Sequence, residues 1–148
     1  MPYLIDTDVV IDHLANLPDA HQLLEQLAPE GIAISMITYM EAYQGVVRSP
    51  NGRDACAKFQ MFRRSVPVLP FSLTVAKRCA ALREQLKHEQ KRVKSRALDL
   101  INAAIAIEHR LTLVTRNTQD YQDIPGLQLY ASVPSSSEIW ECTRYIST

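Results

Sequence analysis

Short apolar runs along the chain alternate with segments in which apolar residues recur at helical spacing. We expect strands at residues 3–5, 32–34, 66–69, 111–114 and 127–130. The first run is apolar throughout, as is typical of a short parallel strand buried on both faces. Pro67 lies inside the third run and cannot donate a ladder hydrogen bond, which predicts that this strand lies at an edge of the sheet.

A carboxylate follows the first strand directly. Apolar residues recur at helical spacing over residues 9–14 and Thr7 is a suitable N-cap, so we expect a helix to begin there. Asp6 then lies beside a helix N-terminus, in the crevice where open α/β sheets bind their ligands. The alternative is that Asp6 only helps Thr7 and Asp8 to cap that helix.

The helix expected after Ser35 carries polar groups at every third position. Ser35, Thr38 and Glu41 should therefore share one side, with Glu41 close to a strand end. The other side is expected to face the core and consists of Met36, Ile37 and Met40. Taken alone, Glu41 is equally compatible with an exposed helical glutamate.

Three further helices are expected: one capped by Asp19, one over residues 53–64, and a long one capped by Ser72 or Thr74. The long helix has basic residues on one face and an apolar stripe on the other. The stripe consists of Val75, Cys79, Leu82 and Leu86.

The helix expected over residues 97–109 is apolar on nearly all sides and should run through the middle of the fold. Its only polar residues between positions 98 and 107 are Asp99 and Asn102. An unpaired carboxylate in such surroundings costs several kcal/mol or becomes protonated. Asp99 therefore pairs with Arg96, or only favours the helix N-terminus, or binds a metal ion together with other carboxylates.

Polar residues also follow the fourth strand, in the segment 115–121. Asn117 and Asp120 occupy the same kind of place there as Asp6 does after the first strand. Residues 131–148 form a tail of different character. Its apolar residues are expected to dock on the body, to dock on a partner, or to fray: Ile139, Trp140, Tyr145 and Ile146.

The composition of the 148 residues is that of one ordinary globular domain, which we place at residues 1–130. The sequence has no apolar run long enough to cross a membrane and no signal-peptide pattern, so we expect a cytoplasmic protein that does not contact membranes. The three cysteines are odd in number and far apart, which argues against a disulfide framework or a zinc site: Cys56, Cys79 and Cys142.

Sixteen basic and sixteen acidic residues cancel, but half of the basic ones lie between positions 77 and 96. A solvated helix face is the usual reason for such a run, and contact with a polyanion is the alternative. The candidates for RNA contact within it are Lys87, Lys91, Arg92, Lys94 and Arg96.

Four motifs in this order resemble those of PIN domains, and most closely those of VapC-type ribonuclease toxins. They are Asp6 after an apolar strand, S-x-x-T-x-x-E ending in Glu41 with Gly45 beyond it, D-x-x-x-A-A-x-A from Asp99, and T-x-N-x-x-D-Y over residues 115–121. The resemblance covers about residues 1–130. Asn117 departs from it, because many members have an acidic residue there.

The resemblance implies a three-layer α/β/α sandwich around a mostly parallel sheet, and an endoribonuclease that uses Mg²⁺ or Mn²⁺. The family's acidic set then falls on Asp6, Glu41, Asp99 and Asp120. Asp6 and Asp99 are the expected principal metal ligands, because carboxylate oxygens suit these ions and no Cys or His is near in sequence. Expected supporting residues are Asp8, Ser35, Thr38, Thr115 and Asn117.

The same resemblance implies an RNA substrate, for which a structured RNA such as tRNA is a candidate. It also implies a cognate antitoxin protein and a homodimer. Tyr39, Met40 and Tyr43 exceed what one small core need bury and are candidates for a contact surface.

Two other classes of function were compatible with parts of the sequence. Residues 5–9 also resemble the nucleophile motif of haloacid-dehalogenase-type phosphotransferases, with Asp6 as nucleophile and Asp8 as acid and base. Such an enzyme would not need Glu41 and Asp99. A non-catalytic RNA-binding module would use only the basic run and would bind RNA without metal.

Overall fold

The computed structural model describes residues 2–131. Five strands form one sheet with the order β3-β2-β1-β4-β5, and every neighbouring pair is parallel. Their bounds are β1 Tyr3–Ile5, β2 Ile32–Ser35, β3 Val68–Leu69, β4 Thr112–Val114 and β5 Gln128–Leu129. The five expected strands are thus present. β3 lies at an edge, where the missing N–H of the preceding Pro67 disrupts no central ladder.

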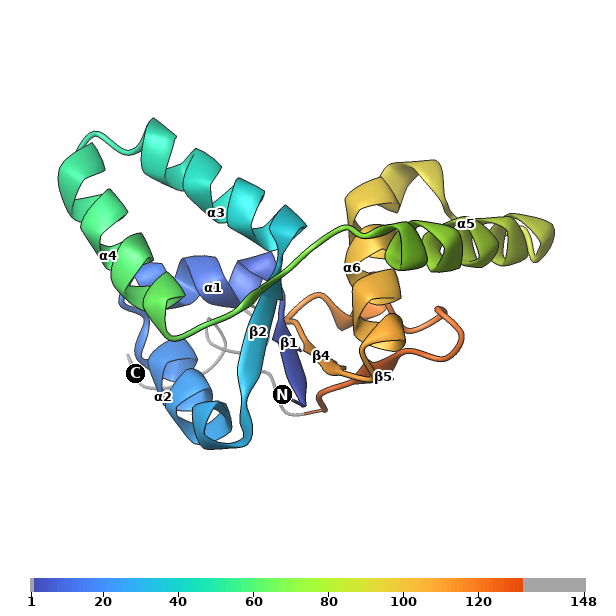
Figure 1. Cartoon of the computed structure of the whole chain (residues 1–148), viewed down its shortest axis with the longest axis horizontal. Helices are drawn as coiled ribbons and strands as arrows, with labels where there is room; N and C mark the ends of the chain where they lie inside the picture. The colour runs from blue at the N-terminus through green and yellow to red at the C-terminus, as the bar shows by residue number, and fades with distance from the viewer. Residues whose placement is uncertain (1, 132–148) are drawn as a thin grey trace, which may run out of the picture.

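Helices cover both faces of this sheet (Figure 1). They are α1 Thr7–Leu14, α2 Pro18–Leu27, α3 Met36–Arg48, α4 Gly52–Arg64, α5 Leu73–His88 and α6 Ala97–Glu108. In the view of Figure 1, helices α1 to α4 lie to the left of the strands and α5 and α6 to the right. The predicted three-layer α/β/α sandwich around a parallel sheet is confirmed.

Alternation of side chains along the strands creates two separate cores. On β1, Leu4 packs in the cluster formed with α5 and α6, and Ile5 packs in the cluster formed with α1 to α4. On β4, Leu113 and Val114 divide between the two clusters in the same way. Both faces of the central strands are therefore buried, which explains their continuous apolar runs.

The long helix α5 buries the expected stripe, and its N-cap is Ser72, whose hydroxyl accepts a hydrogen bond from the amide of Val75 at 3.2 Å. For the first two helices the expected N-caps, Thr7 and Asp19, are wrong. Asp6 itself caps α1, with its carboxylate accepting from the amide of Thr7 at 2.9 Å. The cap of α2 is Leu17, because Pro18 takes the first helical position and needs no hydrogen-bond acceptor.

The expected core face of α3 is wrong. Met36 and Met40 are 46% and 49% exposed, whereas Thr38, Ala42 and Val46 are buried. Thr38 can lie inside because its hydroxyl lies 3.0 Å from that of Thr7 and 3.3 Å from that of Ser35. The methionines therefore point away from the sheet.

Among residues 2–131, no helix is long and apolar enough to cross a membrane. Cys56 and Cys79 are free thiols, while Cys142 and the proposed docking residues of the tail lie outside the described residues.

Candidate active site

Polar side chains gather where three neighbouring strands end. Asp6 follows β1, Ser35 ends β2 and Thr115 follows β4. Because β1 lies between β2 and β4, these ends meet at the point where the strand order changes direction, which is where open α/β sheets form their ligand crevice. Asp99, in the first turn of α6, adds a second carboxylate to this edge.

Asp6 is the most buried of these acids, with 7% of its surface exposed. One carboxylate oxygen accepts from the amide of Thr7 at 2.9 Å and from Nδ2 of Asn102 at 3.2 Å. The other accepts from the hydroxyl of Thr115 at 2.8 Å and lies 3.3 Å from the hydroxyl of Tyr121. Asp6 thus serves both as the helix cap and as the centre of this cluster.

The charge of this cluster is poorly compensated. Burial first, and the nearby Asp8 carboxylate second, raise the pKa of Asp6 to about 6, although its hydrogen bonds oppose the rise. The pKa of Asp99 is also raised, first by burial and then by the carboxylates of Asp6, Asp120 and Glu41. Within residues 2–131, neither Asp6 nor Asp99 forms a salt bridge. A cation between them would stabilise both charges.

Tyr121 connects the two acids, and we assigned it no role from the sequence. Its hydroxyl lies 3.0 Å from Oδ1 of Asp99 and 3.3 Å from Oδ2 of Asp6, and the residue is only 1% exposed. The only sequence signal was its place as the last residue of the T-x-N-x-x-D-Y motif. A buried tyrosine needs a partner for its hydroxyl, and here two carboxylates supply it.

Glu41 is connected to the cluster indirectly, by a hydrogen bond to Thr7 at the start of α1. Its carboxylate accepts from the hydroxyl of Thr7 at 2.7 Å, and this hydroxyl also lies 3.0 Å from that of Thr38. Ser35 donates to Oδ1 of Asn102 at 2.5 Å, which turns Nδ2 of that amide toward Asp6. Ser35 and Thr38 therefore act on the acids through Asn102 and Thr7 rather than by direct contact.

Asp8 lies beside the cluster, but backbone groups hold its carboxylate. It accepts from the amides of Val9 at 2.7 Å and Arg116 at 3.0 Å, and it lies 3.3 Å from the hydroxyl of Thr115. Burial raises its pKa. Through its contacts with Thr115 and Arg116, Asp8 supports the loop after β4.

Asp120 is held away from the other acids by partners of its own. Arg92 donates to one oxygen at 2.6 Å and Asn117 to the other at 2.5 Å, and these hydrogen bonds lower the pKa of Asp120. Asn117 thus orients an acid instead of supplying one.

No group of three or more His, Cys, Asp or Glu side chains within residues 2–131 is close enough to hold a metal ion. The donors at the centre are two carboxylates, Asp6 and Asp99, with the Tyr121 hydroxyl between them. Hard oxygen donors with uncompensated charge fit Mg²⁺ or Mn²⁺, which also keep several water ligands. The residues present therefore fit a divalent ion held by two side chains and water.

The predicted RNA-contacting residues do not form one set. Lys87 and Lys94 are exposed and form no salt bridge within the described chain. Lys91 binds Glu89 at 3.0 Å, and Arg92 binds Asp120. Only part of the basic run is thus available to an RNA backbone without breaking an existing contact.

Arg96 does not belong to the basic surface, because it is 3% exposed. Its guanidinium binds the Asp123 carboxylate at 2.5 and 2.9 Å and the Asp120 carbonyl oxygen at 2.8 Å. Asp99 is not its partner. Arg96 instead connects the segment before α6 to the loop after β4. The partner of Asp99 is Tyr121, whose hydroxyl lies 3.0 Å from its carboxylate.

Comparison with known proteins agrees with this geometry. The PIN domain family model matches residues 3–127. "Ribonuclease VapC2" of Rickettsia felis is 33% identical over 131 residues, which are 87% of this chain and 96% of that protein. "tRNA(fMet)-specific endonuclease VapC" of Shigella flexneri is 24% identical, over 86% of this chain and 96% of that protein.

Solved structures show the same fold. VapBC2 from Rickettsia felis, bound to a DNA fragment from its promoter, aligns with a TM-score of 0.80 and 29% identity over 90% of this chain and 100% of that one. A toxin–antitoxin complex from Klebsiella pneumoniae aligns with a TM-score of 0.70 and 33% identity over 88% and 99%.

The fold, the strand-end acids and the family match together define the class: the chain belongs to the PIN-domain family. Within that family it is similar to VapC ribonucleases, so the resemblance drawn from the four motifs is confirmed. The phosphotransferase interpretation of Asp6 and Asp8 is not supported, because the PIN domain model matches residues 3–127 and Asp99 shares the Tyr121 hydroxyl with Asp6.

Proposed function

We propose that this chain is a metal-dependent endoribonuclease and the toxin of a toxin–antitoxin pair. The observation that carries the proposal is the pair Asp6 and Asp99, brought to one hydroxyl from different elements with no salt bridge to either acid within residues 2–131. Cleavage of RNA by the purified chain, dependent on Mg²⁺ or Mn²⁺ and lost in Asp99→Asn, tests it.

Asp6 and Asp99 would hold the ion, and Asn102 and Thr115 orient the carboxylate of Asp6. When bound, a divalent ion lowers the pKa of a water ligand and neutralises charge that develops on the phosphate. Glu41 and Asp120 act around this pair as outer ligands or by positioning water. Asp120 has to leave Arg92 to do so, and an RNA phosphate is a suitable new partner for that arginine.

The proposed substrate is RNA, guided by exposed lysines of the basic run. Lys87 lies in the last turn of α5, and Lys94 lies in the short helix Lys94–Arg96. The name of the Shigella relative specifies a tRNA. A structured RNA such as tRNA is therefore the first substrate to test.

Loss of these two lysines should weaken RNA binding without changing the chemistry. For Lys87→Ala with Lys94→Ala, we expect a higher KM, and a slope of log affinity against log salt smaller by about 1.5, since each lost phosphate contact removes about 0.7–0.9. The kcat should stay near the wild-type value, because these groups bind ground and transition states alike. Cleavage assays over a salt series measure both.

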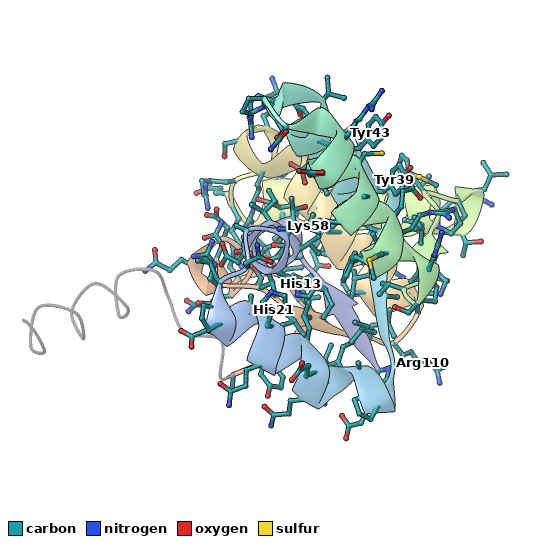
Figure 2. All side chains as sticks on the ribbon, turned by 90° about the vertical axis from the view of Figure 1, so that its left-hand side faces the viewer. His13, His21, Tyr39, Tyr43, Lys58 and Arg110 are labelled. Atoms are coloured by element: carbon teal, nitrogen blue, oxygen red, sulfur yellow. The ribbon has the colours of Figure 1, made fainter. Side chains whose placement is uncertain are left out.

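Lys58→Ala is the matched control, since this exposed lysine lies on α4, on the other side of the sheet (Figures 1 and 2). A double variant with wild-type KM and salt slope would show that the two lysines only solvate the surface.

The proposed protein partners are a cognate antitoxin, as in the VapBC complexes that the chain resembles, and a second copy of the chain. In the cytoplasm, the antitoxin would keep the nuclease inactive. Apolar side chains form a continuous exposed stripe on α3 at helical spacing: Met36, Met40, Tyr43 and Val47, exposed by 46, 49, 42 and 72%. Tyr39 stacks on Tyr43 beside it, with parallel rings 6.1 Å apart (Figure 2).

We expect the purified chain to be a dimer and Met40→Glu with Val47→Glu to be a monomer, because charges would enter an apolar interface. Light scattering at tens of micromolar measures this, with Gln60→Glu on α4 as a control for added charge. A monomeric wild-type chain would contradict the homodimer.

A further inference from the structure

We infer that Tyr121 is a positioning residue for the metal site: its hydroxyl holds the carboxylates of Asp6 and Asp99 in the arrangement that receives the ion. This inference rests on the proposed function, since it concerns the same two acids. It goes beyond that function by assigning a role to a side chain that is neither acidic nor basic.

The first argument is that the hydroxyl reaches both acids. It lies 3.0 Å from Oδ1 of Asp99 and 3.3 Å from Oδ2 of Asp6. A phenol has one proton to donate, so two acceptors at these distances share it. The shared donor limits how far the two carboxylates can turn apart.

The second argument is that Asp99 has no other orienting partner in the structure. Asp6 accepts from Thr7, Asn102 and Thr115, whereas the one hydrogen bond to the Asp99 side chain within residues 2–131 comes from Tyr121. Without the hydroxyl, the rotamer of Asp99 would be set only by packing. Tyr121 is also the one described side chain that bonds to both acids.

The third argument is that the ring itself is held rigidly. Tyr121 is 1% exposed and belongs to the core cluster formed with α5 and α6. On either side of it in the chain, Arg96 binds the carbonyl oxygen of Asp120 at 2.8 Å and the carboxylate of Asp123. The position of the hydroxyl is therefore fixed by the packing of the ring and by the contacts of the buried Arg96 with the residues on either side.

The experiment uses Tyr121→Phe, which keeps the ring and removes only the hydroxyl oxygen. We expect the variant to bind Mn²⁺ about 10-fold or more weakly than the wild type, as for other losses of a group that orients a metal ligand. Titration calorimetry or the spin-resonance signal of free Mn²⁺ measures the affinity without any RNA. Circular dichroism in EDTA checks that the variant is folded, which we expect because Phe fills the same space.

Tyr130→Phe is the matched control, because its ring packs against Tyr3 and not against the acids. Mn²⁺ affinity of Tyr121→Phe equal to that of the wild type would overturn the inference and leave the proposed function intact. A wild-type chain that fails to bind millimolar Mn²⁺ would overturn both, so the two failures are distinguishable.

Discussion

Asp99→Asn is expected to abolish metal-dependent RNA cleavage while the protein stays folded. Asn has the shape of Asp and keeps an oxygen that can accept from Tyr121, which lies 3.0 Å from this side chain. It removes the negative charge that a divalent ion requires. Metal ions supply several kcal/mol of charge stabilisation to the transition state, so we expect a loss in rate of about a thousandfold or more.

Asp6→Asn should have the same effect, since Asp6 supplies the other central carboxylate. Asp19→Asn is the control, because this exposed acid lies in the first turn of α2, away from the strand ends. The measurement is single-turnover cleavage at saturating Mg²⁺, with circular dichroism to verify folding. Cleavage by Asp99→Asn at the wild-type rate would mean that the proposed site is wrong.

Local patterns identified Asp6 and Asp99 as candidate site residues, and the resemblance to PIN domains implied that they meet. Asp6 comes directly after a wholly apolar strand, and Asp99 begins a helix that is apolar on nearly all sides. In a parallel sheet, the carboxyl ends of the strands share one edge, so elements far apart in sequence bring their ends together.

The role of Tyr121 could not be predicted in this way, because it depends on a distant ion pair. Arg96 turns inward only because Asp123, 27 residues later, meets its guanidinium. In the sequence, Arg96 is one member of a basic run and looks like its neighbours. Nothing local distinguishes the buried arginine from the exposed lysines at positions 87 and 94.

The error on α3 has a similar cause. Helical spacing defines two possible buried faces, one with Met36 and Met40 and one with Thr38, Ala42 and Val46. Hydrophobicity alone favours the methionines. The second face is buried because the Thr38 hydroxyl finds two partners, Ser35 at the start of its own helix and Thr7 on α1, and the second depends on α1 and α3 lying side by side.

Asp6→Asn is also expected to stabilise the metal-free protein at neutral pH, although it removes activity. Burial raises the pKa of Asp6 from an ordinary 3.8 to about 6, so its ionised form costs free energy in the folded state. Two pKa units correspond to about 3 kcal/mol at most. The new amide can accept from Thr7 and Asn102 with its oxygen and donate to the hydroxyls of Thr115 and Tyr121.

The sign of the pH dependence follows from the direction of this shift. Between pH 4 and about 6, the folded wild-type chain binds more protons at Asp6 than the unfolded chain does, so its stability falls as pH rises through this window. The advantage of Asp6→Asn should therefore be largest above about pH 7 and should shrink toward pH 4. Burial lowers the pKa of His13, which acts in the opposite direction, but His13 is present in both proteins and cancels in their difference.

Mg²⁺ should offset this advantage of Asp6→Asn, because an ion that binds only the folded state adds stability by mass action, about 2.7 kcal/mol at 100 times its dissociation constant. The wild type then gains and Asp6→Asn does not. Urea unfolding of both proteins from pH 4.5 to 8, in EDTA and in excess Mg²⁺, measures all four combinations. If the wild type is indifferent to Mg²⁺ and Asp6→Asn is less stable than it in EDTA at pH 7.5, Asp6 is a structural helix cap and not the centre of a metal site.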